Sequence, residues 1–261
     1  MKTNLPSSGI LTKPFLLAAA LACGPLLPVE QAAAQAAPVS VANLRNTAPY
    51  DSVGRLTMRM GTSNRVGSAT VIKPYSLLTA GHNLYSKGTG WRTNVVFQRS
   101  YHNGTSASSS SASRLFIPGG YAAAVDSGSA TTNTAFSRDT GGVICFSRPM
   151  NGGHAGWWAN TALLTGSAYN MSLGYGAQVS NGGQLQRSAP TRAFTLVTGS
   201  YYKNATYGLE GGMSGGPVFA RSGTSWYVCA VNVSGPVAVN TGAGVRALDT
   251  DTVNLIRNNL Q

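Results

Sequence analysis

Acidic residues, histidines and cysteines are all scarce in this sequence, and each scarcity narrows what the protein can do. Seven acidic residues stand against 19 lysines and arginines, which gives a formal net charge of +12. The basic residues are scattered singly, without a cluster or an aromatic-interleaved stripe, and this argues against a nucleic-acid partner and favours a cationic secreted protein. No cysteine and histidine have the spacing of a metal site, so we expect no metal.

A membrane-spanning run is also missing. The apolar stretch from Phe15 to Cys23 is too short to cross a bilayer. It follows two lysines and precedes a small-x-small pattern at residues 34–36, which together predict a signal peptide over residues 1–36. We therefore expect a secreted or periplasmic chain that begins near Ala37, with lipid anchoring through Cys23 as the alternative.

Two cysteines, Cys145 and Cys229, remain after such a cleavage, and both lie in apolar, strand-like runs. An even count in an oxidising compartment makes a disulfide possible, but the sequence leaves two buried free thiols open as well. About 225 residues remain, a length that suits one large all-β domain or two small ones sharing a cleft.

Glycine and proline interrupt the chain often, and the runs between them are short and rich in β-forming residues. Hairpin-type Asn-Gly dipeptides occur at 103–104, 151–152 and 181–182. This punctuation is typical of an all-β barrel or sandwich. The Ser-, Ala- and Thr-rich stretch 105–113 predicts a surface loop. One helix is expected at the C-terminus, capped by Asp249 or Thr250.

The segment 211–218, Gly-Gly-Met-Ser-Gly-Gly-Pro-Val, holds Ser214 between glycine pairs and runs into an apolar strand. Glycines allow a sharp turn in which amide N–H groups converge on a negative oxygen, the arrangement called an oxyanion hole. The alternative is a glycine-rich hairpin with an incidental serine. The same letters match the G-x-S-x-G elbow of α/β-hydrolases, but there the catalytic histidine follows the serine, whereas every histidine here precedes Ser214.

A candidate base lies upstream of this serine. An apolar strand ends in Thr79-Ala80-Gly81, and these small residues let the imidazole of His82 face a cleft. His102 and His154 have no such framing, although a lone histidine is more often an ordinary surface or core residue.

The base of such a serine also needs a carboxylate to fix the imidazole tautomer. Asp126 and Asp139 are the two aspartates between His82 and Ser214. Asp139 directly precedes an apolar strand that would bury it beside the base. Asp126 lies in a turn-like Asp-Ser-Gly-Ser sequence, so we favour Asp139.

These three segments, in the order His, Asp, Ser, resemble those of the chymotrypsin-like (trypsin-fold) serine protease superfamily. The chain looks like a bacterial member of it, nearer to the glutamyl-endopeptidase branch than to the animal trypsins. The similar segments are Ser68–Asn83, Ser137–Phe146 and Gly212–Val218. The resemblance runs from about Tyr50 to the end. It implies an all-β fold of two six-stranded antiparallel β-barrels with the active site between them and a C-terminal helix, in a protease domain over 50–261 preceded by a short propeptide or N-terminal extension over 37–49.

The resemblance also implies an activity, that of a serine endopeptidase working through an acyl-enzyme on polypeptides. Ser214 would be the nucleophile, His82 the general base and Asp139 the group orienting it, while the amides of Gly212 and Ser214 would hold the oxyanion. No cofactor is implied, and we expect a monomer. The alternatives are a catalytically silent binding module on the same fold and an esterase that uses the same triad.

Two departures from the family pattern stand out. Met213 replaces the aspartate that pairs with a newly cut N-terminus in trypsin-like enzymes, and Asn83 replaces the cysteine that flanks the histidine. Gly208 occupies the position of the aspartate that gives trypsins their basic specificity, and Asn232 the position of a pocket histidine in glutamyl endopeptidases. We therefore expect a neutral substrate pocket involving Gly208, Glu210 and Asn232, with Glu210 able to supply a charge if it turns inward.

Overall fold

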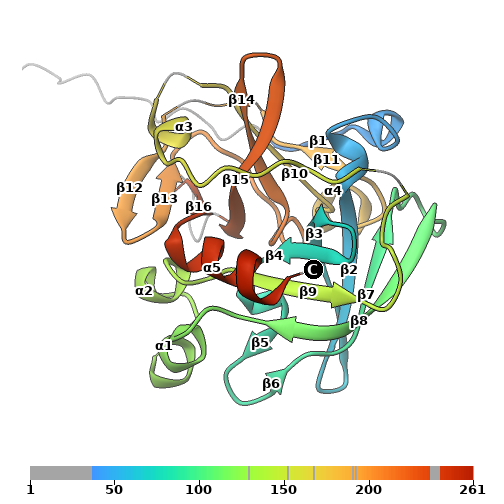
Figure 1. The fold of residues 1–261 in the computed structure, drawn as a ribbon, viewed down its shortest axis with the longest axis horizontal. Coiled ribbons are helices and arrows are strands. Elements are labelled where there is room, and N and C mark those ends of the chain that lie inside the picture. Colours follow the sequence, from blue (N-terminus) through green and yellow to red (C-terminus); the bar gives the residue numbers. More distant parts are fainter. Residues whose placement is uncertain are drawn as a thin grey trace, which may run out of the picture. The chain divides into compact units, whose positions relative to one another are not determined.

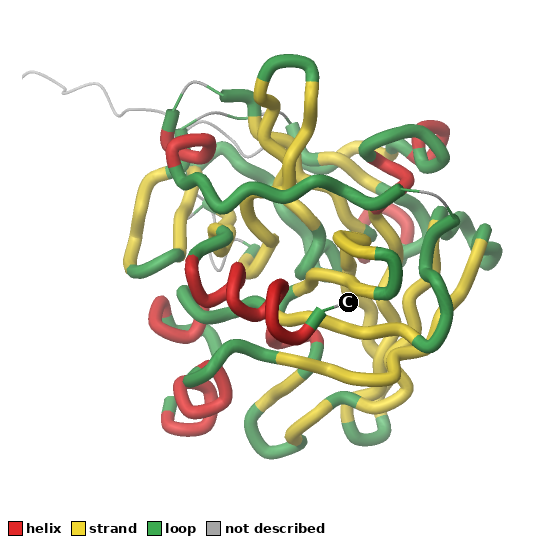
Figure 2. The backbone as a smooth tube through the Cα atoms, in the orientation of Figure 1, coloured by secondary structure: helices red, strands yellow, loops and turns green. Residues whose placement is uncertain are grey.

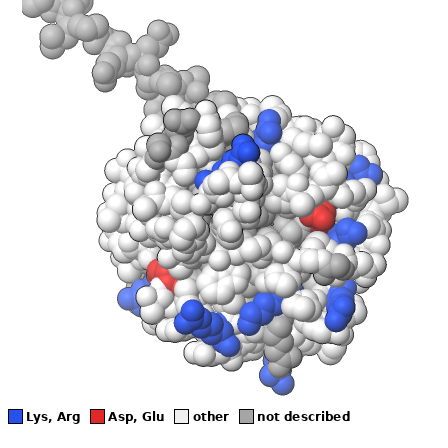
Figure 3. All heavy atoms as spheres, turned by 45° about the horizontal axis from the view of Figure 1, so that its top comes forward, with Lys and Arg blue, Asp and Glu red and all other residues white. Residues whose placement is uncertain are grey.

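The computed structural model describes residues 37–260 except 129, 152, 167, 190, 192 and 236–241. The expected signal peptide, with Cys23, lies outside these residues. No helix in the described part of the chain is long and apolar enough to cross a membrane. On the face drawn in Figure 3, lysines and arginines lie in separate groups and do not merge into one patch.

The first half of the described chain forms a closed antiparallel barrel whose strand order is β2-β3-β4-β9-β8-β7 (Figure 1). The bounds are β2 Val53–Met60, β3 Ser63–Lys73, β4 Ser76–Thr79, β7 Thr93–Arg99, β8 Ser108–Phe116 and β9 Gly141–Cys145. Side chains alternate along β2, so that Leu56 and Met58 enter the barrel core while Arg59 faces outward. A small hairpin of β5 (Tyr85–Ser86) and β6 (Gly90–Trp91) lies beside it.

The loop expected over 105–113 is wrong from Ser108 onward, because β8 begins there. Serine has little β-propensity, but here its hydroxyls bond to neighbouring backbone. Ser108 Oγ donates to Pro149 O at 2.9 Å, Ser110 Oγ to Ser147 O at 2.9 Å and Ser113 Oγ to Ile144 O at 3.0 Å. Pairing with β7 and β9 therefore overrides the local composition.

The second half forms an antiparallel sheet in the order β1-β11-β10-β14-β15-β16-β13-β12. The bounds are β1 Val39–Ser40, β10 Asn170–Gly174, β11 Gln186–Arg187, β12 Thr195–Thr198, β13 Tyr201–Asn204, β14 Pro217–Ser222, β15 Ser225–Ser234 and β16 Ala243–Ala247. The all-β expectation is confirmed. The sheet has eight strands, since β1 and β12 add to its two edges. Residues 37–49 thus contribute a strand and the buried Val41 to this half.

Helices are few and short in the part of the chain that the structure describes, as Figure 2 shows. They are α1 Tyr121–Ser127, α2 Asn133–Phe136, α3 Ala162–Thr165, α4 Ala177–Ser180 and α5 Thr250–Asn259, with one-turn 3₁₀ segments at η1 Ala42–Leu44, η2 Tyr50–Ser52 and η3 Gly81–Asn83. The expected C-terminal helix α5 is confirmed, and its N-cap is Asp249, whose carboxylate accepts the Thr252 N–H at 3.0 Å. Its other end is held by Lys73, whose ammonium donates to two of the last carbonyls.

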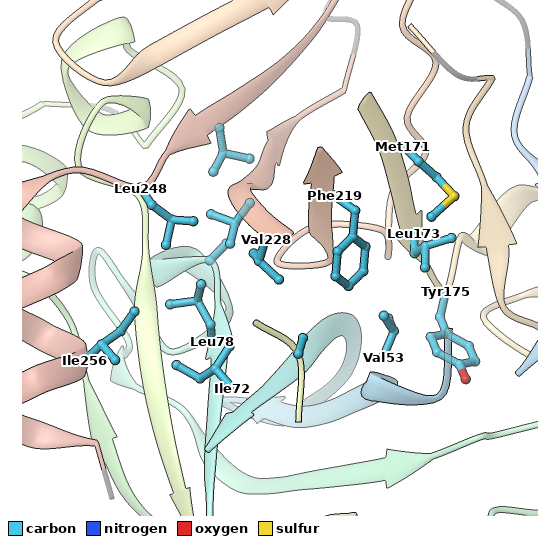
Figure 4. Close-up of a cluster of buried hydrophobic side chains, with 14 of the residues drawn as sticks. Val53, Ile72, Leu78, Met171, Leu173, Tyr175, Phe219, Val228, Leu248 and Ile256 are labelled. Carbon is cyan, nitrogen blue, oxygen red and sulfur yellow. The ribbon is translucent and has the colours of Figure 1, made fainter. Parts of the chain in front are cut away.

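One apolar cluster joins the two halves (Figure 4). Val53, Ile72 and Leu78 from the barrel meet Phe219 and Val228 from the sheet, and Ile256 docks α5 on the same cluster. Because the two halves share this core, the loops that carry the candidate site residues have a fixed common base.

The two cysteines do not form a disulfide. Cys145 is buried in the barrel core and Cys229 in the core of the sheet, and both are free thiols. Burial raises the pKa of the Cys145 thiol to about 11 and raises that of Cys229 as well. Both therefore remain protonated at neutral pH and behave as small apolar core residues.

Candidate active site

The candidate base lies on a tight turn at the end of β4. The backbone leaves the strand at Ala80 and forms the one-turn η3, with His82 at its centre. Gly81 must be small, because a Cβ there would lie 2.9 Å from Thr140 O and 3.0 Å from the Tyr121 ring. The turn leaves the His82 side chain 29% exposed, so one ring edge reaches solvent.

Asp139 holds this histidine at two points. Its Oδ2 lies 2.6 Å from His82 Nδ1, and its Oδ1 accepts the His82 backbone N–H at 2.9 Å. The Asp139 side chain is 1% exposed, and β9 begins two residues later, as the sequence argument required. Asp126 instead accepts a hydrogen bond from Tyr85 at 2.7 Å. The pairing fixes the tautomer with its proton on Nδ1 and leaves Nε2 free to accept a proton.

The electrostatic surroundings set the proton affinity of this pair. Burial lowers the pKa of His82, but the charge of Asp139 and its hydrogen bond raise it, and the net direction is upward from 6.5. The Arg92 guanidinium, which donates to His82 O at 3.2 Å, lowers the pKa of His82. The phenol of Tyr121 is also buried, and burial together with the Asp139 charge raises its pKa, so it stays neutral.

The candidate nucleophile lies on a turn that depends on glycine. Gly212 has φ +95° and Gly215 φ +80°, and a Cβ at either position would collide with backbone or side-chain atoms. At Gly212 the nearest atom would be Tyr175 O, and at Gly215 the hydroxyl of Thr79. The glycine pattern seen in the sequence therefore has a steric cause at these two positions.

Two residues of the barrel hold this turn beside the histidine. The Ser214 carbonyl accepts the Ser68 N–H at 2.8 Å and the Asn83 Nδ2–H at 2.9 Å. Ser68 Oγ also donates to Gly212 O at 2.8 Å. Since Asn83 directly follows His82, the base and the nucleophile segment are connected through one side chain. Asn83 stands out in the sequence as a departure from the family pattern, but its contact with Ser214 is not visible there, because the two residues are 131 positions apart.

The residues expected around a substrate pocket lie mostly below the surface. Gly208 is buried, and Glu210 is 7% exposed with its Oε2 accepting the Gln178 N–H at 3.1 Å. A Cβ on Gly176 would lie 2.5 Å from the same Oε2, so the carboxylate points into the turn that begins α4. Asn232 is fully buried, and its amide bonds to protein groups.

No family model matches the chain. Over 187 residues it is 33% identical to the glutamyl endopeptidase of Bacillus licheniformis, a match covering 69% of this chain and 52% of that protein, so the chain spans about half the length of that relative.

Solved structures share the fold. Protease Anisep from Arthrobacter nicotinovorans superimposes with a TM-score of 0.64 at 24% identity, covering 79% of this chain and 94% of that one. A Glu endopeptidase in complex with MPD gives 0.66 at 20% identity, with 84% and 94% covered. A thermostable serine protease, AL20, from an extremophilic microorganism gives 0.63 at 20%, with 78% and 94% covered.

Proposed function

We propose that this chain, which belongs to the chymotrypsin-like serine protease superfamily and is similar in sequence to its glutamyl-endopeptidase branch, is itself a serine endopeptidase. The observation that carries the proposal is the double contact of the buried Asp139 with His82, on the turn that Asn83 ties to Ser214. A core histidine needs no such carboxylate on its backbone N–H and its ring together. For a general base, the contact with the ring orients the imidazole, and here the bond from the His82 backbone N–H fixes the carboxylate beside that ring.

In the proposed mechanism, Ser214 Oγ attacks the scissile carbonyl carbon while its proton passes to His82 Nε2. The carbonyl π electrons move to oxygen, and the amides of Gly212 and Ser214 stabilise that oxyanion. Asp139 keeps Nδ1 protonated and stabilises the imidazolium. His82 then gives the proton to the leaving amine as the C–N bond breaks, and water, activated by the same base, hydrolyses the acyl-enzyme.

A neutral pocket is proposed for the side chain before the cleaved bond. Gly208 supplies no charge, and Glu210 points into the turn at Gln178. The undescribed segment 236–241 carries no charged residue in the sequence. Burying a charged substrate side chain without a counter-charge is unfavourable, so uncharged side chains should be preferred.

Secretion remains part of the proposal, with residues 1–36 as a signal peptide. The mature enzyme is then a monomer whose protease domain, 50–261, keeps residues 37–49 attached, including the edge strand β1. The contact of Val41 with the common core supports this retention, because removal of 37–49 would expose apolar surface.

The test uses the purified protein with a fluorophosphonate probe and a mixed peptide library. We expect labelling at Ser214 and peptide cleavage, and both Ser214→Ala and His82→Ala should lower kcat by about three orders of magnitude or more, because triad members act as a unit. Labelling without peptide cleavage but with ester hydrolysis would indicate the esterase alternative. A folded protein that neither labels nor cleaves would indicate the silent binding module.

A further inference from the structure

The buried amide of Asn232 lies directly beneath the nucleophile turn. Its side chain is in β15, next to the irregular register between β15 and β16, and no part of it is exposed. Asn232 Nδ2 donates to Met213 O at 3.2 Å and to Leu173 O at 3.4 Å. On the other side, Asn232 Oδ1 accepts from Ser172 Oγ at 2.8 Å and from Tyr207 at 3.3 Å.

These partners fix which way the amide faces. Two carbonyl oxygens require donors, and two hydroxyls can give protons to an acceptor, so only one orientation of the amide satisfies all four contacts. The backbone of Asn232 adds two more bonds, accepting from Gly215 N at 2.8 Å and donating to Gly216 O at 2.9 Å. All the hydrogen-bonding groups of Asn232 are therefore used inside the protein, and none is left for a substrate.

The contact with Met213 O has a consequence for catalysis. In a trans peptide, the C=O of one residue and the N–H of the next point in opposite directions within one plane. Asn232 Nδ2 and Gly216 N hold the Met213 carbonyl on the inner side of the turn, at 3.2 and 3.0 Å. The N–H of Ser214 must then point to the outer side, where an oxyanion would be bound.

The side chain of Met213 strengthens the same restraint. It is fully buried in the apolar cluster that contains Tyr207, Val218 and Cys229. The peptide plane between Met213 and Ser214 therefore cannot rotate without pulling the Met213 side chain from its cluster and breaking the hydrogen bond from Asn232 to the Met213 carbonyl. No charged group is needed for this restraint.

We propose that Asn232 is a positioning residue that holds the Ser214 N–H in the geometry of an oxyanion hole. This inference rests on the proposed serine protease function. It assigns to Asn232 a support beneath the reacting atoms, in place of the direct substrate contact expected from the sequence.

The test compares Asn232→Ser with Asn170→Ser. Asn170 is a matched control, because it is also a fully buried asparagine whose Nδ2 donates to two carbonyls, Leu163 O and Ala168 O, both at 3.2 Å, but these carbonyls lie outside the nucleophile turn. Removing one oxyanion donor typically lowers kcat about 10²–10³-fold, and loosening one should lower it less, by about 10- to 100-fold. We expect that loss in Asn232→Ser with KM changed less than about threefold, and kcat near wild type in Asn170→Ser.

Inhibitor binding separates this role from a loss of stability. Addition of Ser214 to a peptide aldehyde places the former carbonyl oxygen in the oxyanion hole, whereas a reduced-amide peptide of the same sequence has no such oxygen. Asn232→Ser should weaken aldehyde binding by about the factor lost in kcat and leave reduced-amide binding unchanged. The acid limb of its pH–rate profile should also be unchanged, because His82 is untouched.

Several outcomes would overturn the inference. These are a kcat within threefold of wild type, a loss shared equally by Asn170→Ser, or equal weakening of both inhibitors. If Asn232→Ser does not fold, Ser172→Ala replaces it, because this variant removes the shorter of the two hydrogen bonds to Asn232 Oδ1 and should lower kcat and aldehyde affinity together by about three- to tenfold. Unchanged values there would overturn the inference too. A wild-type protein that does not label with fluorophosphonate would instead refute the proposed function.

Discussion

Gly67 and Asn83 fit each other so closely that substitutions at the two positions should not be additive. A Cβ on Gly67 would lie 2.6 Å from Asn83 Nδ2 and 2.7 Å from Oδ1, and its third-nearest atom, at 2.8 Å, is Asn83 Cγ. The same Nδ2 donates to Ser214 O. Gly67→Ala should therefore push the amide away from Ser214, while Asn83→Ala removes all three of the atoms that the new methyl group would strike.

The expected energies follow from these contacts. Gly67→Ala alone overpacks a buried site and should destabilise by about 2 kcal/mol. Asn83→Ala leaves the Ser214 carbonyl with one donor fewer and a small cavity, at a cost of about 2 kcal/mol. In the double variant the methyl group enters that cavity, and the lower entropy of the unfolded alanine chain contributes about 0.4–1 kcal/mol of stability. The double variant should thus be no less stable than Asn83→Ala, a coupling of about 2 kcal/mol or more.

Urea unfolding of the four proteins measures this coupling, in a Ser214→Ala background that prevents self-digestion. In the active background, kcat of Gly67→Ala and of Asn83→Ala should fall about tenfold, because both release the nucleophile from its alignment with His82. Free energies that add within about 0.5 kcal/mol would refute the steric argument. An unchanged kcat in Asn83→Ala would refute the claim that its amide aligns the serine.

Three further predictions concern charge. Activity should rise with pH through a midpoint above 6.5, since the neutral form of His82 is the base and its pKa is raised. Because the Arg92 charge lowers the pKa of His82, Arg92→Gln should move that midpoint higher, and an unshifted kcat/KM profile at low salt would contradict this. Burial raises the pKa of Asp249, but the Arg246 charge and hydrogen bonds outweigh it and lower the pKa below 3.8, so stability should be lost as the pH falls through that lowered value. Asp249→Asn should cost about 3 kcal/mol at pH 7 and flatten this dependence in urea unfolding, because it leaves the buried Arg246 unpaired; a cost below 1 kcal/mol would contradict it. With peptides that carry Ala, Leu, Phe, Gln, Glu, Lys or Arg before the cleaved bond, the enzyme should prefer the uncharged residues by kcat/KM, and Glu210→Gln should leave this order unchanged. A tenfold preference for Glu, or a tenfold preference for Lys or Arg that Glu210→Gln abolishes, would exclude the neutral pocket.

The sequence allowed the segments around His82, Asp139 and Ser214 to be found because each is local. A strand followed by small residues, an aspartate at the entry to an apolar strand and a glycine-framed serine are all visible within about ten residues. The strand β8 was missed for the opposite reason, since the backbone acceptors for its serine hydroxyls come from residues 31 to 41 positions later. The sequence could not decide whether Cys145 and Cys229 form a disulfide, because this depends on which core each strand enters.

The role of Asn232 was out of reach for a more specific reason. The side chain was expected in the substrate pocket only because of the position it occupies in the family pattern. An asparagine within an apolar strand does not indicate which groups it will hydrogen-bond to. Those partners are Ser172 and Leu173 from β10, Tyr207 and Met213, and they meet only when the sheet and the nucleophile turn are assembled. A buried amide with four partners is a property of the folded chain, whereas composition and spacing describe only neighbours in sequence.

The hydrogen-bond donors that hold the turn around Ser214 are all uncharged groups. The Ser214 carbonyl is held by a backbone N–H and the amide of Asn83, and the Met213 carbonyl by a backbone N–H and the amide of Asn232. None of these donors titrates between pH 5 and 9, in contrast to an α-ammonium that must stay charged to order the turn. The acid limb of the rate should therefore report His82 alone, and activity on the alkaline side should persist past pH 8, where an α-ammonium would lose its proton. A decline in kcat/KM centred near pH 8, with the fold intact by fluorescence, would show that a titrating group supports the turn after all.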